Sequence, residues 1–304
     1  MFTPFITPSL TLTALAEDTS PLKAKRLSIV ATTGIIGDTV KSIGGALVEV
    51  SSLMGEGVDP HLYKASPGDM KKLLGSDLVF HNGLHLEGKM AEALEKLATR
   101  RPVVAVTRSV PRELLRAPTD HPDAVDPHVW FSPKIWGFVI DEITRTLSSS
   151  IPHGANELNA NAARVTQEFR ELDTWIQNKI NTIPPERRIL ITAHDAFGYF
   201  GATYGISVLS IQGMSTDSEA SLQEINQLVE TIVSKAIPAV FVESSVPQKT
   251  VTALVEGATA RGHQVKIGGE LFSDALGATG TTTGTLPGII RHNTETIVNA
   301  LKKE

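Results

Sequence analysis

The stretch from residue 155 to residue 182 constrains the fold most, because it contains neither glycine nor proline. Its apolar residues recur every three or four positions, at Leu158, Ala162, Val165, Phe169, Leu172, Ile176 and Ile180. This spacing lines them up in one stripe along a helix. Pro184 and Pro185 follow, and helical geometry is disfavoured for a residue that precedes a proline. The sequence therefore predicts a single long amphipathic helix here.

Short β-branched runs alternate with amphipathic stretches on both sides of this helix. The runs lie at 27–32, 48–53, 77–82 and 102–107, and again at 188–194, 206–211, 239–244 and 264–269. Strands that alternate with helices typically form a parallel sheet covered by those helices. We therefore predict an α/β fold of two parallel-sheet lobes, residues 27–150 and 186–304, bridged by one long linking helix within residues 151–185.

The composition excludes several classes of function. The 304 residues include 28 Lys and Arg against 33 Asp and Glu, a formal net charge of −5, with no basic block. Nucleic acid is not an expected partner, because neutralising phosphates requires clustered cations. The chain has no cysteine, which excludes thiolate nucleophiles and cysteine-ligated metals. No segment approaches the roughly 20 apolar residues of a membrane span.

Residues 1–20 are expected to be an export signal or a disordered tail. The apolar run from Leu10 ends in Ala14-Leu15-Ala16, which has the small-residue pattern of a signal cleavage site. A charged n-region is missing from this segment, but the export signal is the favoured alternative.

The tripeptide Asp-Pro-His occurs twice, ending at His61 and at His128. Proline fixes its own φ and favours an extended residue before it, so each histidine is expected in a preset loop. A lone loop histidine is usually surface, but two identical settings favour metal ligation. Asp59 and Asp126, which begin the tripeptides, could accept the second ring N–H of each histidine.

Two further candidates follow strands of the second half. His194 ends the run at 188–194, and Asp274 comes after the last strand. Taken alone, the segment around either residue could simply be the start of a helix, with an aspartate as its N-cap. Ligands of doubly wound sheets gather beyond the carboxyl ends of the strands, so these residues could meet His61 and His128 between the lobes. Glu243, at the end of the run at 239–244, is a further acceptor candidate or merely a capped strand end.

Three imidazoles and one carboxylate suit a divalent first-row cation, readily zinc and also manganese or ferrous iron. Calcium and magnesium prefer oxygen ligands throughout. The run from Gly83 to Lys89 copies the G-x-x-x-x-G-K of a phosphate-binding loop. Met90 stands where that motif needs a serine or threonine for magnesium, so nucleotide binding is not expected.

The chain resembles the TroA-type metal-binding receptors of ABC importers. The resemblance covers residues 27–303 and rests on these segments in order: GEGVDPHLYKASPGDM, VFHNGLHLEGKM, DPHVWFSPK, ILITAHDAFGYFGATYG, IQGMSTDSEAS, VFVESSVPQK and IGGELFSDALG. The resemblance implies two lobes joined by a long helix, with metal ligands at His61, His128, His194 and Asp274. Some manganese receptors of this kind carry Glu at the third position, whereas histidine at 194 resembles zinc- or zinc/manganese-binding members.

The resemblance implies a monomeric, non-enzymatic periplasmic protein that binds zinc or manganese, with iron as a further possibility, and delivers it to the membrane subunits of an ABC permease. The lipid-attachment cysteine of surface-tethered members is missing, which favours a free periplasmic form. Two alternatives stay open. A metal-dependent hydrolase would keep an open coordination position, and an adhesin or other interaction protein could share the scaffold.

Overall fold

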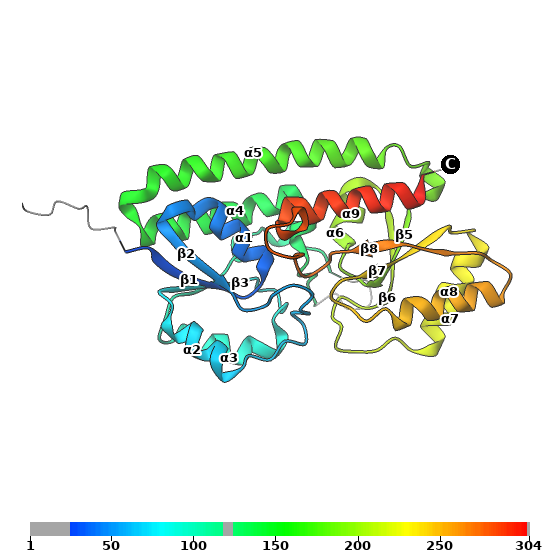
Figure 1. Cartoon of the computed structure of the whole chain (residues 1–304), viewed down its shortest axis with the longest axis horizontal. Coiled ribbons are helices and arrows are strands. Elements are labelled where there is room, and N and C mark those ends of the chain that lie inside the picture. The colour runs from blue at the N-terminus through cyan, green and yellow to red at the C-terminus, as the bar shows by residue number, and fades with distance from the viewer. Residues whose placement is uncertain (1–24, 118–123, 303–304) are drawn as a thin grey trace, which may run out of the picture.

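One helix runs along both lobes of the molecule. In the computed structural model, which describes residues 25–117 and 124–302, this helix is α5 (Ala155–Ile180), with 26 residues. Figure 1 shows α5 spanning from the first lobe to the second. All seven apolar positions of its predicted stripe are buried. The predicted linking helix is therefore confirmed, whereas the predicted signal or tail at residues 1–20 lies outside the described residues.

The first lobe is built on a parallel sheet of four strands in the order β2-β1-β3-β4. The strands are β1 (Leu27–Ala31), β2 (Val48–Ser52), β3 (Leu78–His81) and β4 (Val103–Ala105). The helices are α1 (Gly34–Gly44), α2 (Pro67–Gly75), α3 (Ala91–Ala98) and α4 (Pro133–Ser150). Side chains alternate between the faces of a strand. Ile29 and Phe80 accordingly pack in the core beneath α1, α4 and α5, whereas Val30 and Val79 pack against α2 and α3.

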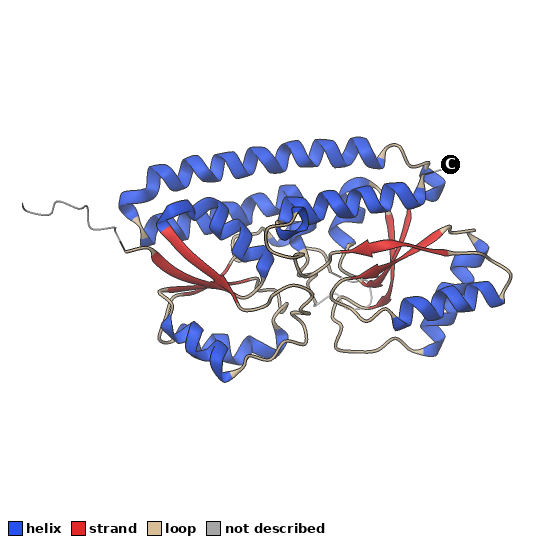
Figure 2. Cartoon of the chain, viewed as in Figure 1, coloured by secondary structure: helices blue, strands red, loops and turns tan. Residues whose placement is uncertain are grey.

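The second lobe repeats the alternation with two parallel strand pairs, β5–β6 and β7–β8. The strands are β5 (Ile189–His194), β6 (Ser207–Gln212), β7 (Ala239–Glu243) and β8 (Lys266–Leu271). The helices are α6 (Gly198–Tyr204), α7 (Leu222–Ser234), α8 (Lys249–Ala260) and α9 (Leu286–Leu301). Figure 2 shows the strands of both lobes covered by helices, and α7 and α8 form a separate apolar cluster with β5 and β7.

The starts of α2 and α3 differ in how they are formed. Ser66 caps α2 in a capping box with Asp69, and Pro67 occupies the first turn, where its fixed φ suits the helix. A 3₁₀ turn over Gly88–Met90 precedes α3, which begins only at Ala91 and has no side-chain N-cap hydrogen bond. Among the described residues, no helix combines the length and apolar character needed to cross a membrane.

A single apolar core extends under α5 through both lobes. It contains Ile43 of α1, Ile140 of α4, Phe169 of α5, Phe241 of β7 and Ile297 of α9. Close-packed interiors deform little, so this shared core opposes a wide hinge motion between the lobes. The predicted α/β architecture with a bridging helix is confirmed, while the domain boundaries drawn from the sequence stay a prediction.

The shared core generates a stability prediction. Leu172→Ala in α5 should lower the free energy of unfolding by about 2–5 kcal/mol, since a fully buried leucine leaves a cavity. The exposed neighbour change Arg170→Ala should alter it by less than about 0.5 kcal/mol. Urea unfolding followed by circular dichroism measures both. Two separate transitions, with only one shifted by Leu172→Ala, would show that the lobes do not share one core.

Candidate metal-binding site

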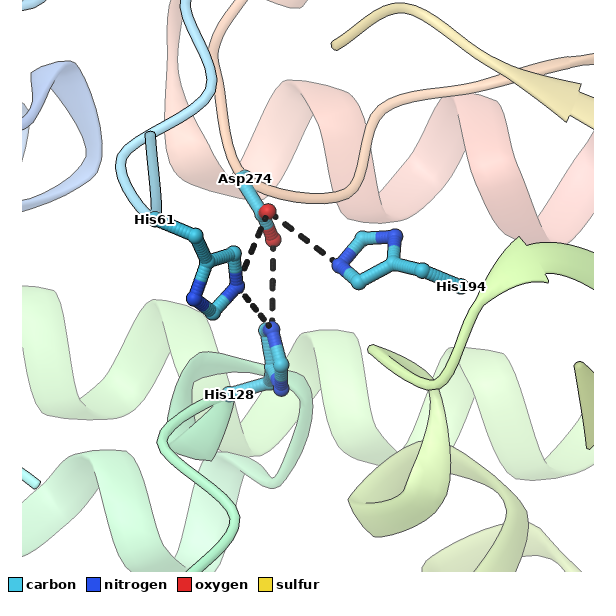
Figure 3. A group of neighbouring side chains, drawn as sticks. All are labelled: His61, His128, His194 and Asp274. Carbon is cyan, nitrogen blue, oxygen red and sulfur yellow. Dashed lines mark hydrogen bonds and ion pairs between the residues drawn. The ribbon is translucent and has the colours of Figure 1, made fainter. Parts of the chain in front are cut away.

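The four predicted ligand residues lie in loops or at a strand end where the two lobes meet. His61 lies between β2 and α2, and His128 directly precedes the 3₁₀ turn Val129–Phe131. His194 is the last residue of β5, and Asp274 follows β8. Figure 3 shows their side chains pointing toward one another from these separate segments. Each lobe therefore contributes two of the four side chains.

The donor atoms of the four side chains surround a common point. One ligand atom from each residue lies within 4.8 Å of the others. His61 Nε2 lies 3.4 Å from His128 Nε2, and His194 Nε2 lies 3.2 Å from Asp274 Oδ2. Asp274 Oδ1 lies 3.5 Å from His128 Nε2. Donors bound at about 2.0–2.1 Å to a tetrahedral ion lie roughly 3.3 Å apart, so the spacing fits a transition-metal ion.

The same atoms are sealed from solvent. His128 and His194 are 0% exposed, Asp274 is 1% exposed and His61 is 3% exposed. Within the described part of the chain, His194 Nε2 and both Asp274 oxygens lack a hydrogen-bond partner. Buried polar atoms are normally paired, because leaving them unpaired costs free energy. A divalent cation among these donors would satisfy them together.

Carboxylates behind two of the imidazoles fix which ring nitrogen faces the centre. Asp126 Oδ1 lies 2.8 Å from His128 Nδ1, and Glu243 Oε2 lies 2.6 Å from His194 Nδ1. A carboxylate only accepts, so each Nδ1 carries the proton and donates it. When the ring is neutral, each Nε2 then carries a lone pair directed at the centre, as in histidines that bind metals. The prediction that Asp126 and Glu243 play this part is confirmed.

The matching prediction for Asp59 is wrong. Asp59 Oδ1 accepts a hydrogen bond from the backbone N–H of His61 at 2.8 Å, so it holds the main chain and not the ring. Its other oxygen, Oδ2, accepts from the hydroxyl of Thr216 at 2.5 Å, in the second lobe. Asp126 likewise accepts the backbone N–H of His128 at 3.0 Å, so the two tripeptides share this bond, and only the second also turns its aspartate toward the ring.

The four side chains differ in electrostatic setting. Burial lowers the pKa of His61 to about 4, so this imidazole is neutral across the ordinary pH range. Burial also lowers the pKa of His194, but the carboxylates of Glu243 and Asp274 outweigh burial and hold that pKa well above its usual range. Burial raises the pKa of Asp274, while the His194 and His128 charges outweigh it and lower the pKa. His194 and Asp274 are therefore an ion pair at neutral pH.

Two residues not singled out as site residues in the sequence hold the backbone of the Asp274 loop. Asn293 of α9 accepts from the Phe272 N–H at 2.9 Å and donates to the Phe272 carbonyl at 2.7 Å. Trp130, in the first lobe, donates through Nε1 to the Ser273 carbonyl at 3.0 Å. No local pattern signals these contacts, because each joins a side chain to a backbone group in another segment.

The Trp130 hydrogen bond generates a prediction with a matched control. Trp130→Phe should lower the free energy of unfolding by about 1–3 kcal/mol more than Trp136→Phe, because it leaves the Ser273 carbonyl without its donor. Both tryptophans are buried, and Trp136 Nε1 has no partner among the described residues. Urea unfolding gives both values. Equal losses in the two variants would mean that the hydrogen bond between the lobes contributes nothing.

Comparison with known proteins places the chain among metal-uptake proteins. The model of the family described as ZnuA, zinc-uptake complex component A, periplasmic, matches residues 29–300. The manganese-binding lipoprotein MntA of Bacillus subtilis (strain 168) is 47% identical over 292 residues, covering 96% of this chain and 95% of the relative. The zinc-binding protein TroA of Treponema pallidum (strain Nichols) is 44% identical over 288 residues, covering 95% and 91%.

A solved structure agrees with these relatives. The periplasmic zinc-binding protein TroA from Treponema pallidum superposes with a TM-score of 0.89 at 44% identity, covering 92% of this chain and 100% of that chain. The similarity extends over both lobes and the bridging helix and so includes nearly all described residues. The family resemblance seen in the sequence is thereby confirmed. The chain belongs to the ZnuA/TroA family of metal-binding substrate-binding proteins.

Proposed function

We propose that this protein binds one divalent transition-metal ion with His61, His128, His194 and Asp274 and delivers it to an ABC-type permease. The observation that carries the proposal is the convergence of four buried donor groups, two from each lobe, on one point. Such a site closes only when both lobes are in place. An ion held there is carried as cargo and leaves when the lobes or their loops separate.

The charges around the site support a divalent ion. Asp274 provides one negative charge in direct reach of the ion, and the Asp126 and Glu243 carboxylates lie one imidazole further out. In a buried setting these carboxylates offset the charge of the cation and strengthen the imidazoles as ligands. Three nitrogen donors favour zinc over manganese or ferrous iron in intrinsic affinity. We therefore propose zinc as the tighter-bound ion in vitro.

The names of the relatives support the delivery step and leave the physiological metal open. MntA of Bacillus subtilis is described as manganese-binding and TroA of Treponema pallidum as zinc-binding. PsaA of Streptococcus mitis is described as a manganese ABC transporter substrate-binding lipoprotein. We propose an extracytoplasmic location, in the periplasm, with permease membrane subunits as partners. A monomeric state and a role for iron stay predictions.

The two alternatives are less well supported. A metal-dependent hydrolase needs a coordination position open to water, whereas the four donors here are protein groups that are almost fully buried. Neither a hydrolase nor an adhesin appears in the names of the relatives described above.

Capture is expected to involve small loop and lobe movements, since the core under α5 is continuous.

Asp274→Asn tests the site with minimal change of shape. It should lower the affinity for zinc by more than about a hundredfold, because it removes the only negative charge in contact with the ion. For comparison, loss of a group that merely hydrogen-bonds a metal ligand lowers metal affinity by up to about a hundredfold. Asp141→Asn makes the same chemical change at an exposed position of α4 and should leave the affinity unchanged. Calorimetric titration with zinc and manganese, separately and in competition, measures this. Unchanged zinc binding by Asp274→Asn would refute the proposed site.

The pKa values predict proton release on binding. His194 holds a proton at neutral pH, because its pKa is raised, and it must lose that proton to offer Nε2 to the ion. His61 contributes no proton, since its pKa is about 4. Protons thus compete with the ion at lower pH, and the affinity should fall about tenfold per unit as the pH drops below the raised His194 pKa.

Calorimetry in buffers of different ionisation enthalpy should detect proton release on zinc binding near neutral pH. Binding without proton release, at an affinity that stays flat between pH 6 and pH 8, would contradict the ion pair between His194 and Asp274.

A further inference from the structure

A short loop of the second lobe reaches across to the first lobe beside His61. This segment, residues 213–218, is here termed the latch loop. It begins directly after Gln212 of β6, which pairs with His194 of β5. Two hydrogen bonds anchor it to the second lobe, from Asp195 N to the Gly213 carbonyl at 3.2 Å and from Gln212 Nε2 to the Ser218 carbonyl at 3.0 Å. The base of the latch loop is therefore tied to the strands that carry His194.

The tip of the latch loop binds Asp59, whose carboxylate holds the backbone of His61. Thr216 is 9% exposed, and its hydroxyl donates to Asp59 Oδ2 at 2.5 Å. The other oxygen of the same carboxylate accepts the His61 N–H at 2.8 Å. One carboxylate thus joins the main chain of a metal-site histidine in one lobe to a hydroxyl of the other lobe.

An ion pair beside this hydrogen bond also links the lobes. Lys89 Nζ lies 2.8 Å from Asp217 Oδ1, and the two side chains are 41% and 42% exposed. Lys89 is the lysine of the run that copies a phosphate-binding loop, and here it belongs to the 3₁₀ turn Gly88–Met90. This lysine contacts a carboxylate of the opposite lobe, so the sequence run serves an interlobe contact.

His61 is held differently from the other two histidines. The rings of His128 and His194 are fixed through Nδ1 by Asp126 and Glu243, whereas the carboxylate nearest His61 in sequence holds only its backbone. His61 is therefore the histidine that a local loop movement can withdraw with the least disruption.

We propose that the latch loop, through Thr216 and Asp217, holds His61 in the site and sets the rate at which the bound ion is released. The inference rests on the proposed function and adds two positioning residues to it. Breaking the contacts to Asp59 and Lys89 removes two polar links between the latch loop and the first lobe, one of them to the carboxylate that supports His61, while α5 and the shared core stay intact. A permease that displaces this exposed loop would thereby lower the barrier to release without opening the whole molecule.

The test measures zinc release into an excess of a chromogenic chelator by stopped flow. Thr216→Val removes the hydroxyl at nearly constant shape and should speed release about fivefold, the scale of one lost hydrogen bond. Thr216→Ser keeps the hydroxyl and should restore the original rate. Lys89→Met should speed release about twofold at low salt and less at high salt, as for an exposed ion pair.

Lys96→Met is the matched control, because Lys96 pairs with Glu92 within α3 and bridges no lobes. It should leave the release rate unchanged. A second readout needs no metal. Hydrogen exchange of the His61 amide in the metal-free protein should be faster in Thr216→Val and normal in Thr216→Ser.

Wild-type release rates in both Thr216→Val and Lys89→Met would overturn the latch while leaving the proposed metal binding in place. If Thr216→Val does not fold, the exposed change Lys89→Met still decides the question. Absence of zinc binding by the unaltered protein would instead contradict the proposed function itself, so the two failures are distinct.

Discussion

The buried carboxylate of Asp274 is the constraint around which the site is organised. An ionised group removed from water costs several kcal/mol unless charges and hydrogen bonds compensate it. Its two oxygens face ring nitrogens of His61, His128 and His194 at 3.2 to 3.6 Å. The compensation therefore comes from charge, either the protonated His194 or a cation held by all four groups. This makes proton binding and metal binding exclusive at the same place.

The surroundings of Asp274 show how the two lobes share one site. Its loop is held from its own lobe by Asn293 and from the other lobe by Trp130. The continuous apolar core under α5 fixes the lobes at a nearly constant separation. A packed core has few intermediate arrangements, so large movements there are costly. Small displacements of exposed loops, such as residues 213–218, therefore open the coordination shell at a lower cost in free energy than a movement of the lobes.

The sequence predicted some residues of the candidate site and their roles correctly, and others only in part. The repeated Asp-Pro-His tripeptide drew attention to His61 and His128, and the ends of two strands led to His194 and Glu243. The sequence assigned Asp59 and Asp126 the same part, and this was wrong for Asp59, which bonds the backbone of His61 and the hydroxyl of Thr216. Local spacing limits where an aspartate can reach, but the opposite lobe decides which atom it meets.

The sequence by itself determined the long helix, the order of strands and helices, and the types of side chain available as metal donors. Apolar periodicity and proline placement act over a few residues, so the helices and strands that they predict can be recognised without knowledge of the fold. Only the tertiary structure decided that donors from positions 61 to 274 converge on one point, and that Trp130, Asn293 and Thr216 hold their loops. Those contacts join segments far apart in the chain, and their geometry follows from the packing of both lobes against α5.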